Sequence, residues 1–282
     1  MAVTRPSIAE RRARFRQLHE AGCFLIPNPF DVGSARYLQS LGFAALASTS
    51  SGSAFTQGRP DGGMTLDDVL AHLRGLVEAC DLPVNADFED GHAANEDDLA
   101  RNVARCIATG VAGLSIEDST GNASQPLYPF AQSVSRMRAA RAAIDASGQD
   151  VLLVGRAECF LTGHEQPLDE ALRRLVAYAE AGADCLYAPG VRTRADIEAI
   201  VRAVDPKPVN VLVGWPSDFT LQELGDMGVR RVSVGGALAA AAWGGFITAA
   251  KSLADGRFDG FAGNAPTREI HAFFQADVAK RS

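Results

Sequence analysis

The feature that most constrains the fold is a short unit that recurs four times along the chain. In each copy a helix pattern ends at a glycine, which supplies the left-handed conformation common at helix C-termini, and a short apolar strand follows. The copies are LGFAALAS (41–48), TGVAGLSIED (109–118), AGADCLYAP (181–189) and MGVRRVSVGG (227–236). Each strand then runs into small or polar residues, so the unit reads as helix, turn and buried strand.

Four further apolar segments complete a set of eight strands: CFLIP (23–27), PVNAD (83–87), VLLVGRAE (151–158) and PVNVLVG (208–214). Helix patterns alternate with them, most clearly at 64–80, 169–182 and 193–204. Capping-box spacing marks helix starts at Ser7 and Thr220, the first in an extra N-terminal helix. Eight strand–helix units in about 250 residues predict a single-domain TIM (β/α)8 barrel over residues 1–282. A doubly wound open sheet is the alternative, but no G-x-G-x-x-G motif follows the first strand.

The composition of the chain limits its partners and its location. The chain has 282 residues, 47% of them hydrophobic, and a net charge of −7. This acidic balance argues against nucleic acid as a partner, because binding phosphates needs a basic surface. The five cysteines are scattered without a C-x-x-C pair. They suggest neither a disulfide framework nor a structural zinc site, and they fit a cytoplasmic protein.

The stretch VSVGGALAAAAWGGFITAA (232–250) is uncharged and approaches the length of a membrane span. It is rich in glycine and alanine, and it begins like a strand. We interpret it as a buried strand plus helix, with a membrane span as the alternative, and expect no membrane partner. The first twenty residues hold no apolar run, which argues against a secretory signal.

Three carboxylates crowd the end of one predicted strand, in PVNADFEDG (83–91). Like charges this close raise one another's pKa, so solvent, a basic group or a metal ion must compensate them. The active site of a TIM barrel lies at the carboxyl ends of its strands. The polar residues predicted at or near those ends are Asn28, Asp31, Ser48, Thr49, Ser50, Ser51, Asp61, Asp87, Glu89, Glu117, Asp118, Arg156, Glu158 and Asn210.

The acids on neighbouring strands suggest a metal site. Asp87, Glu89 and Glu117 offer hard oxygen ligands, which suit Mg²⁺, with Mn²⁺ as the alternative ion. No histidine joins them, so a zinc site is disfavoured. Mg²⁺ here would act as a Lewis acid and stabilise an enolate as it forms.

Other polar groups at the strand ends suggest an anionic substrate. Hydroxyl and backbone N–H groups of residues 48–51 suit a carboxylate or phosphoryl oxygen, and Arg156 offers a bidentate fork for another carboxylate. The alternative use of Arg156 is a structural ion pair to Glu158 or Glu117. With a metal, the set describes a site for a small dianionic oxo acid.

Several segments together resemble the isocitrate lyase and phosphoenolpyruvate mutase superfamily over nearly the whole chain. They are PNPFDVGSARYL, SSGSAFTQGRPDGGMTLDDV, PVNADFEDG, GLSIEDS, VGRAE and the NV of strand seven. The resemblance implies a Mg²⁺-dependent barrel, usually a homotetramer in which paired subunits exchange the last barrel helix. It also implies making or breaking C–C or P–C bonds next to a 2-oxo acid, through a pyruvate enolate.

The resemblance further implies roles for single residues. The segment 48–50 matches the part that binds the substrate carboxylate or phosphoryl group, and Asp61 matches a substrate-side acid. Asp87 and Glu117 match metal-shell carboxylates. The residues predicted as catalytic are Asp61, Glu117 and Arg156, those predicted to bind substrate are Ser48, Thr49, Ser50, Asp61, Arg156 and Asn210, and those predicted to bind metal are Asp87, Glu89 and Glu117.

Three departures from the family pattern bear on the activity. The usual D-A-D begins here with Asn85, so the commonest direct metal ligand is missing and Glu89 is expected to take over. The K-[KR]-C-G-H loop of isocitrate and methylisocitrate lyases is replaced by STGNASQPLYPF (119–130), which disfavours those two activities. The mutases carry a longer loop here with a Lys-Thr-Asn element, and only its asparagine has a counterpart in this chain, Asn122. This disfavours phosphonate chemistry as well.

The sequence therefore predicts a Mg²⁺-dependent lyase acting on a small 2-oxo or 2-hydroxy dicarboxylate. Oxaloacetate decarboxylation and C–C cleavage of a substituted malate are the favoured forms. The loop 119–130 is expected to close over the substrate and exclude water. One alternative is phosphonopyruvate hydrolysis or the mutase reaction, and another is a 2-oxo acid binding protein without catalysis.

Overall fold

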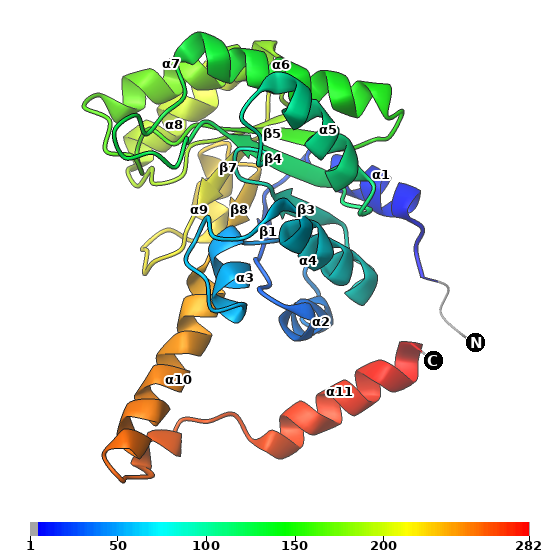
Figure 1. Cartoon of the computed structure of the whole chain (residues 1–282), viewed down its shortest axis with the longest axis vertical. Helices are drawn as coiled ribbons and strands as arrows, with labels where there is room; N and C mark the ends of the chain where they lie inside the picture. The colour runs from blue at the N-terminus through cyan, green and yellow to red at the C-terminus, as the bar shows by residue number, and fades with distance from the viewer. Residues whose placement is uncertain (1–4, 282) are drawn as a thin grey trace.

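Eight parallel strands form one sheet that closes almost completely into a barrel in the computed structural model, which describes residues 5–281 (Figure 1). The strand order is β1-β8-β7-β6-β5-β4-β3-β2, and a backbone hydrogen bond from Ala47 N to Pro27 O, at 3.1 Å, bridges the seam between β1 and β2. The strands are β1 Phe24–Ile26, β2 Leu46–Ala47, β3 Val84–Asp87, β4 Gly113–Glu117, β5 Leu152–Arg156, β6 Cys185–Tyr187, β7 Val209–Leu212 and β8 Arg231–Ser233. The predicted TIM barrel is confirmed, and each predicted strand is present.

Helices alternate with the strands and cover most of the outside of the barrel (Figure 1). They are α1 Ile8–Leu18, α2 Val32–Ser40, α3 Ser50–Thr56, α4 Leu66–Ala79, α5 Glu96–Ile107, α6 Phe130–Ala146, α7 Pro167–Glu180, α8 Arg194–Val204, α9 Leu221–Asp226, α10 Ala237–Ala254 and α11 Thr267–Arg281, with a short 3-10 helix, η1, at Asp259–Phe261. Both predicted capping boxes are present, with Ser7 before α1 and Thr220 before α9.

The main apolar core lies between the strands and the surrounding helices. Leu73 and Leu76 of α4, with Leu99 and Val103 of α5, are fully buried in it. Their spacing of three or four residues places them on one face of each helix, and the polar residues between them face outward. Helical periodicity in the sequence therefore determines which face of each helix covers the barrel.

The extra N-terminal helix, α1, closes the amino end of the barrel. Its Phe15 is fully buried in a small cluster with Ile26 and Leu152. Its Arg12 donates a hydrogen bond to the carbonyl oxygen of Val111, in the turn that leads into β4, at 2.9 Å. Since this end is covered, the opposite, carboxyl end of the strands is the end that can accept a ligand.

Small residues leave room for polar side chains inside the barrel. Ala45 and Ala47 are buried there, and β4 begins with Gly113. A Cβ atom on Gly113 would lie 2.7 Å from Oδ1 of Asn85 and 2.7 Å from the ring of Phe15. Glycine is therefore required at this position for Asn85 to occupy the barrel interior.

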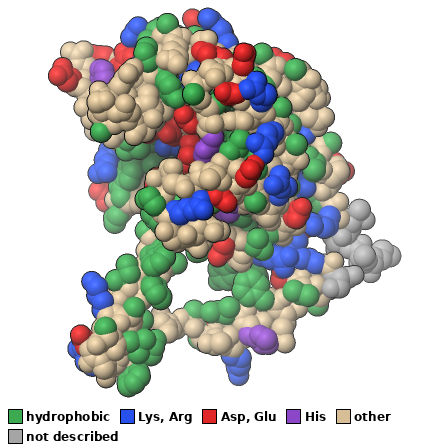
Figure 2. All heavy atoms as spheres, viewed as in Figure 1, with side chains coloured by type: hydrophobic (Ala, Val, Ile, Leu, Met, Phe, Trp, Pro, Cys, Tyr) green, Lys and Arg blue, Asp and Glu red, His purple; other side chains and the backbone are tan. Residues whose placement is uncertain are grey.

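The helix after β8 departs from the prediction. β8 is buried as expected, but α10 runs away from the barrel (Figure 1), and 11% of its 18-residue span is buried. The expectation of a buried helix is therefore wrong for the single chain. Its first turn contacts α3 and its C-terminal part contacts η1, but most of its large apolar side chains stay exposed, and they form a surface at the lower left of Figure 2. By length and composition alone, α10 is also the one helix within residues 5–281 that could cross a membrane.

The last helix, α11, returns from the tip of α10 toward the barrel (Figure 1). Arg36 of α2 forms an ion pair with Asp277 at 3.0 Å, and the ring of Tyr37 meets that of Phe273 edge-on at 5.2 Å. These two contacts attach α11 to α2.

Candidate active site at the carboxyl ends of the strands

Acidic side chains from three neighbouring strands surround one arginine. Asp87 ends β3, Glu117 ends β4 and Arg156 ends β5, and the last two are paired in register. Nη1 of Arg156 lies 3.1 Å from Asp87 Oδ1 and 3.0 Å from Glu117 Oε2, while its Nε donates to Glu158. The parallel sheet thus brings together the predicted acids and the predicted arginine, and the ion pairs of Arg156 to Glu117 and Glu158 are formed.

The segment after β2 positions Asp87. Ser50 N donates to Asp87 Oδ2 at 2.9 Å, and Asp87 N donates to Ser48 Oγ at 2.8 Å. Thr49 is the N-cap of α3, and its Oγ1 accepts from Gly52 N. The structure therefore places Ser48, Thr49 and Ser50 beside the acids, with polar groups of Ser48 and Ser50 engaged by Asp87.

The turn after β3 holds Glu89 and His92 in unusual backbone conformations. Both residues have φ of 50°, which is uncommon for residues other than glycine. Gly91 between them has φ of 79°, and a Cβ atom there would lie 2.1 Å from Leu99 Cδ1. Oε2 of Glu89 lies 3.5 Å from Nε2 of His92. Strain of this kind is common at functional sites and persists only where surrounding contacts enforce it.

Burial and mutual repulsion perturb the charges of the cluster. Burial, followed by the charges of neighbouring aspartates, raises the pKa of Glu89 to about 8. Burial raises the pKa of Glu117 well above its usual value despite the opposing charge of Arg156, and burial also raises that of Glu158. Burial alone would lower the pKa of the Arg156 guanidinium, but the carboxylates around it raise it. Three carboxylates, those of Asp87, Glu117 and Glu158, thus contact one guanidinium while Glu89 lies nearby, and a bound cation would relieve the excess negative charge.

The donor set fits a hard cation in kind, but Arg156 stands in its way. Carboxylate oxygens are the ligands that Mg²⁺ prefers. Within residues 5–281, however, no three His, Cys, Asp or Glu side chains converge closely enough to hold a metal ion as they stand. The guanidinium of Arg156 lies between Asp87 and Glu117, the two acids that an ion would join.

Two cavities meet at the acidic cluster. The mouth cavity, of about 430 Å³, is lined by Glu89, Glu117 and Arg156 among others. The inner cavity, of about 170 Å³, extends into the barrel and is lined by Asp87 and by residues 48–51. Asp61 is exposed and lines both cavities. Of the predicted substrate-binding residues, Asn210 lines neither: it is 1% exposed and donates to Ser233 Oγ at 3.0 Å.

Asp118 supports the site from behind. Its carboxylate accepts hydrogen bonds from Arg174 Nη1 at 2.9 Å, from Tyr178 Oη at 2.5 Å and from Glu158 N at 2.8 Å. These contacts fasten α7 to the ends of β4 and β5. Asp118 is therefore a buried structural acid that fixes the backbone of Glu158.

The loop 119–130 lies beside the mouth cavity. Residues 119–121 line that cavity, and a β-bridge between Ser119 and Leu127 folds the loop back on itself. Tyr128 Oη donates to Asp90 Oδ2 at 3.0 Å, which ties the loop to the turn after β3. The loop is thus placed next to the acids, where closure over a ligand was predicted.

Two inward-facing residues escaped the sequence reasoning. Tyr187, the last residue of β6, lines the inner cavity, and its ring centroid lies 5.4 Å from Cζ of Arg156. Arg231, the first residue of β8, lines the same cavity from inside the barrel. The strand alternation carried a signal for Arg231, because it lies two residues before the inward-facing Ser233.

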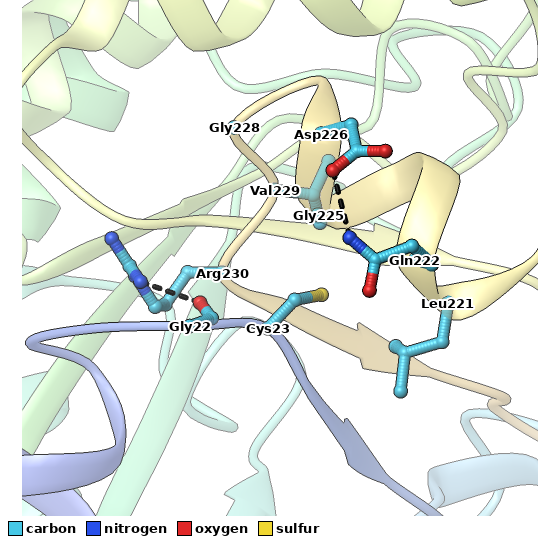
Figure 3. Close-up of a pocket in the computed structure, with 9 residues that line it drawn as sticks. All are labelled: Gly22, Cys23, Leu221, Gln222, Gly225, Asp226, Gly228, Val229 and Arg230. Atoms are coloured by element: carbon cyan, nitrogen blue, oxygen red, sulfur yellow. Dashed lines mark hydrogen bonds between the residues drawn. The ribbon is translucent and has the colours of Figure 1, made fainter.

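A third cavity lies away from the acids and on the other end of the barrel. It has a volume of about 570 Å³ and lies between α9 and the segment that leads into β1 (Figure 3). Gln222, Asp226 and Cys23 are among its lining residues (Figure 3). It contains one carboxylate and none of the predicted site residues, so we do not regard it as the candidate active site.

The barrel and its acidic carboxyl end define a TIM-barrel protein with a candidate active site where the strands end. The particular family follows from comparison with known proteins. The family model described as phosphoenolpyruvate phosphomutase matches residues 15–254, and the chain belongs to this family, within the superfamily of isocitrate lyases and phosphoenolpyruvate mutases.

The chain is similar to several proteins described as lyases. An oxaloacetate decarboxylase from Rhodopseudomonas palustris is 32% identical over 80% of this chain and 77% of its own. The 2-methylisocitrate lyase of Escherichia coli is 32% identical over 71% of this chain and 69% of its own. A crystal structure from Burkholderia cenocepacia, described as a presumed lyase/mutase, is 44% identical, covers 95% of this chain and 97% of its own, and has a TM-score of 0.91.

Proposed function

We propose that this protein is a Mg²⁺-dependent lyase that cleaves a C–C bond in a small 2-oxo or 2-hydroxy dicarboxylate. Oxaloacetate decarboxylation and cleavage of a substituted malate are the two forms we favour. The observation that carries the proposal is the contact of Asp87 and Glu117 with Arg156 over two connected cavities. The similarity to an oxaloacetate decarboxylase supports the choice of substrate class.

Asp87, Glu89 and Glu117 are the residues we propose to hold the ion, with water completing its shell. Bound Mg²⁺ would act as a Lewis acid on the 2-oxo group of the substrate. An ion shared by Asp87 and Glu117 requires Arg156 to move from between them. Glu158, already bonded to Arg156 Nε, would keep the displaced guanidinium at the rim of the site, where it can meet a substrate carboxylate.

The remaining residues orient the substrate and exclude water. In decarboxylation the bond from C3 of oxaloacetate to its terminal carboxylate would break and CO2 would leave, the bond electrons forming the enolate of pyruvate, and a proton from solvent would then add at C3. We propose that residues 48–50 and Asp61, which line the inner cavity, contact the substrate on one side. The loop 119–130 would close the mouth cavity and keep water from the reacting carbon.

The family model also keeps phosphorus chemistry in view, since it is described by the phosphomutase reaction. The loop 119–130 holds no lysine to meet a phosphoryl group, and it holds no cysteine of the kind that the isocitrate lyases carry there. We therefore place phosphonopyruvate second to oxaloacetate, and a binding protein without catalysis third.

The test is pyruvate release from oxaloacetate and from phosphonopyruvate in parallel, with Mg²⁺ or with a chelator, each corrected for uncatalysed decay. Metal-dependent release from oxaloacetate supports the proposal. Faster release from phosphonopyruvate would replace it with P–C chemistry. No release from either would reject oxaloacetate decarboxylation and leave a larger substituted malate or a binding protein, and Mg²⁺-dependent binding of oxalate without turnover of substituted malates would select the binding protein.

We also propose that α10 is covered by a second copy of the chain. Trp243, Phe246, Ile247 and Leu253 expose large apolar surfaces along this helix. A contiguous exposed apolar surface of this kind usually marks an interface. An exchange of this helix between paired subunits, within a homotetramer, would bury it.

A further inference from the structure

A second arginine lies inside the barrel without a charged partner. Arg231 of β8 is 3% exposed. Its Nε donates to Asn210 Oδ1 at 2.8 Å, and its Nη1 donates to Asn85 Oδ1 at 3.3 Å. Both acceptors are neutral amides. Within residues 5–281 its Nη2 has no hydrogen-bond partner, and no carboxylate lies within ion-pairing distance of the guanidinium.

The two arginines of the barrel interior differ in this respect. Arg156 contacts three carboxylates, so its charge is compensated by the protein. The charge of Arg231 is not compensated, although an isolated buried charge is costly unless it is paired. A side chain in this position can bind an anion, whose negative charge would compensate that of the guanidinium.

The inner cavity connects the two arginines. It is lined by Arg156 and Asp87 near the carboxyl ends of the strands and by Arg231 deeper in the barrel. Asn85 lies two residues before Asp87 on β3, so the amide that meets Arg231 is one layer below the acids. Ser115 and Ser233 line the space between and offer hydroxyl groups.

Asn85 has a physical explanation in this arrangement. An aspartate at position 85 would place a carboxylate oxygen near Nη1 of Arg231 and neutralise it, whereas asparagine keeps the shape and leaves the guanidinium free. The amide of Asn210 does the same on Nε. Both residues position the guanidinium of Arg231 without neutralising its charge.

We propose that Arg231 binds one carboxylate of a dicarboxylate substrate at the inner end of the cavity, while the other carboxylate and the reacting carbon lie at the acidic cluster. This inference rests on the proposed lyase function and specifies its substrate: the molecule carries a second carboxylate that reaches below the layer of Asp87. Arg231 is thus a specificity residue that selects dicarboxylates over monocarboxylates of the same length.

The experiment compares binding of succinate and butyrate, which share a four-carbon chain and differ by one carboxylate. Both are titrated calorimetrically into the full chain with Mg²⁺ present. We expect the wild-type protein to bind succinate at least about tenfold more tightly than butyrate, as one charge-assisted contact supplies. Arg231→Met should reduce that ratio to near one, while Arg202→Met, at an exposed arginine of α8, should leave it unchanged.

A second variant keeps the test decisive if Arg231→Met does not fold. Asn210→Asp preserves the side-chain shape and gives Arg231 an internal counter-ion at its Nε. It should lower succinate affinity about tenfold and leave butyrate affinity unchanged. A wild-type ratio near one, or a ratio retained in these variants, would overturn the proposal.

The outcome is independent of catalysis, because neither succinate nor butyrate is a substrate for cleavage. Succinate discrimination that depends on Arg231, in a protein that releases no pyruvate from any oxo acid, would retain this inference and reject the lyase function. Turnover of oxaloacetate with unchanged kcat/KM in Arg231→Met would reject this inference and retain the lyase function.

Discussion

Glu117 and Arg156 occupy paired positions on β4 and β5, and Nη1 of the arginine lies 3.0 Å from a carboxylate oxygen of the glutamate. The same nitrogen lies 3.1 Å from Asp87, one strand further on. A single guanidinium therefore joins the ends of three strands. Because it neutralises acids that would otherwise repel one another, it keeps the cluster assembled.

Removing Asp87 should sharply reduce turnover. Asp87→Ala takes away a proposed metal ligand and the acceptor of Ser50 N, and it leaves Arg156 with one partner fewer. We expect kcat/KM for oxaloacetate to fall about a hundredfold or more, the usual loss when a group that stabilises developing charge is removed. The measurement is pyruvate release at saturating Mg²⁺, with calorimetric titration of Mg²⁺ beside it.

The matched control for this change is Asp97→Ala, at an exposed acid on α5 that takes no part in the site. It should leave both turnover and Mg²⁺ binding as in the wild-type protein. Full activity of Asp87→Ala, in protein that is folded by circular dichroism, would remove Asp87 from the site.

Filling the space at Gly113 should destabilise the barrel. A Cβ atom there meets Asn85, the Phe15 ring and, at 3.2 Å, the backbone oxygen of Leu152. Gly113→Ala should therefore lower the free energy of unfolding by about 2 kcal/mol, in the range of other overpacked cores. Gly75→Ala, within α4, is the control, because its Cβ would make an ordinary 3.7 Å contact with Val32 Cγ2 of α2 and alanine favours helices. The changes in the free energy of unfolding, measured in urea, should thus differ in sign between the two variants. Equal stabilities would mean that the barrel interior has room for a methyl group at position 113.

Much of the fold and part of the site could be predicted from the sequence. Glycine-terminated helices and short apolar strands located all eight strands. In a parallel barrel each strand ends on the same side, so Asp87, Glu117 and Arg156 were expected to meet, and they do. Regular periodicity is a local property, which is why sequence reasoning reached it.

The remaining features depend on partners that local patterns do not name. The composition of α10 predicts an apolar environment, but it does not say whether the same chain or another copy provides it. Both anticipated ion pairs of Arg156 form, to Glu117 and Glu158, and strand packing adds Asp87 as a third partner that local sequence did not name. Arg231 was overlooked because a single basic residue at the start of a strand looks like a surface residue until the alternation of β8 is followed inward.

Placing a charge on α10 should break up the assembly that we propose. Phe246 is 61% exposed in the single chain, and Phe246→Asp would put a carboxylate into any interface that covers it. We expect the wild-type protein to sediment as an oligomer and this variant as a smaller species. Lys251→Gln, on the same helix, removes no apolar surface and should sediment as the wild type does. A monomeric wild-type protein would contradict the assembly.

A buried histidine should make the stability of the fold depend on pH. His19 is 8% exposed, its Nδ1 lies 2.8 Å from the carbonyl oxygen of Phe15, and its Nε2 has no partner among the described residues. Burial, aided by the positive charge of Arg231, lowers the pKa of His19 from 6.5 to about 3. Below pH 6.5 the unfolded chain therefore binds a proton at His19 that the folded chain does not bind. The stability that neutral His19 contributes is full above pH 6.5 and is lost as the pH falls toward 3. Between pH 7 and pH 4.5 this one group should cost roughly 2–3 kcal/mol of the free energy of unfolding.

His19→Gln should lose correspondingly less stability over that interval, measured by urea unfolding at each pH, whereas His271→Gln on the exposed surface of α11 should follow the wild type. Parallel pH curves for wild type and His19→Gln would show that the folded barrel accepts the proton, and that α1 does not seal its amino end as tightly as the contacts of Phe15 indicate.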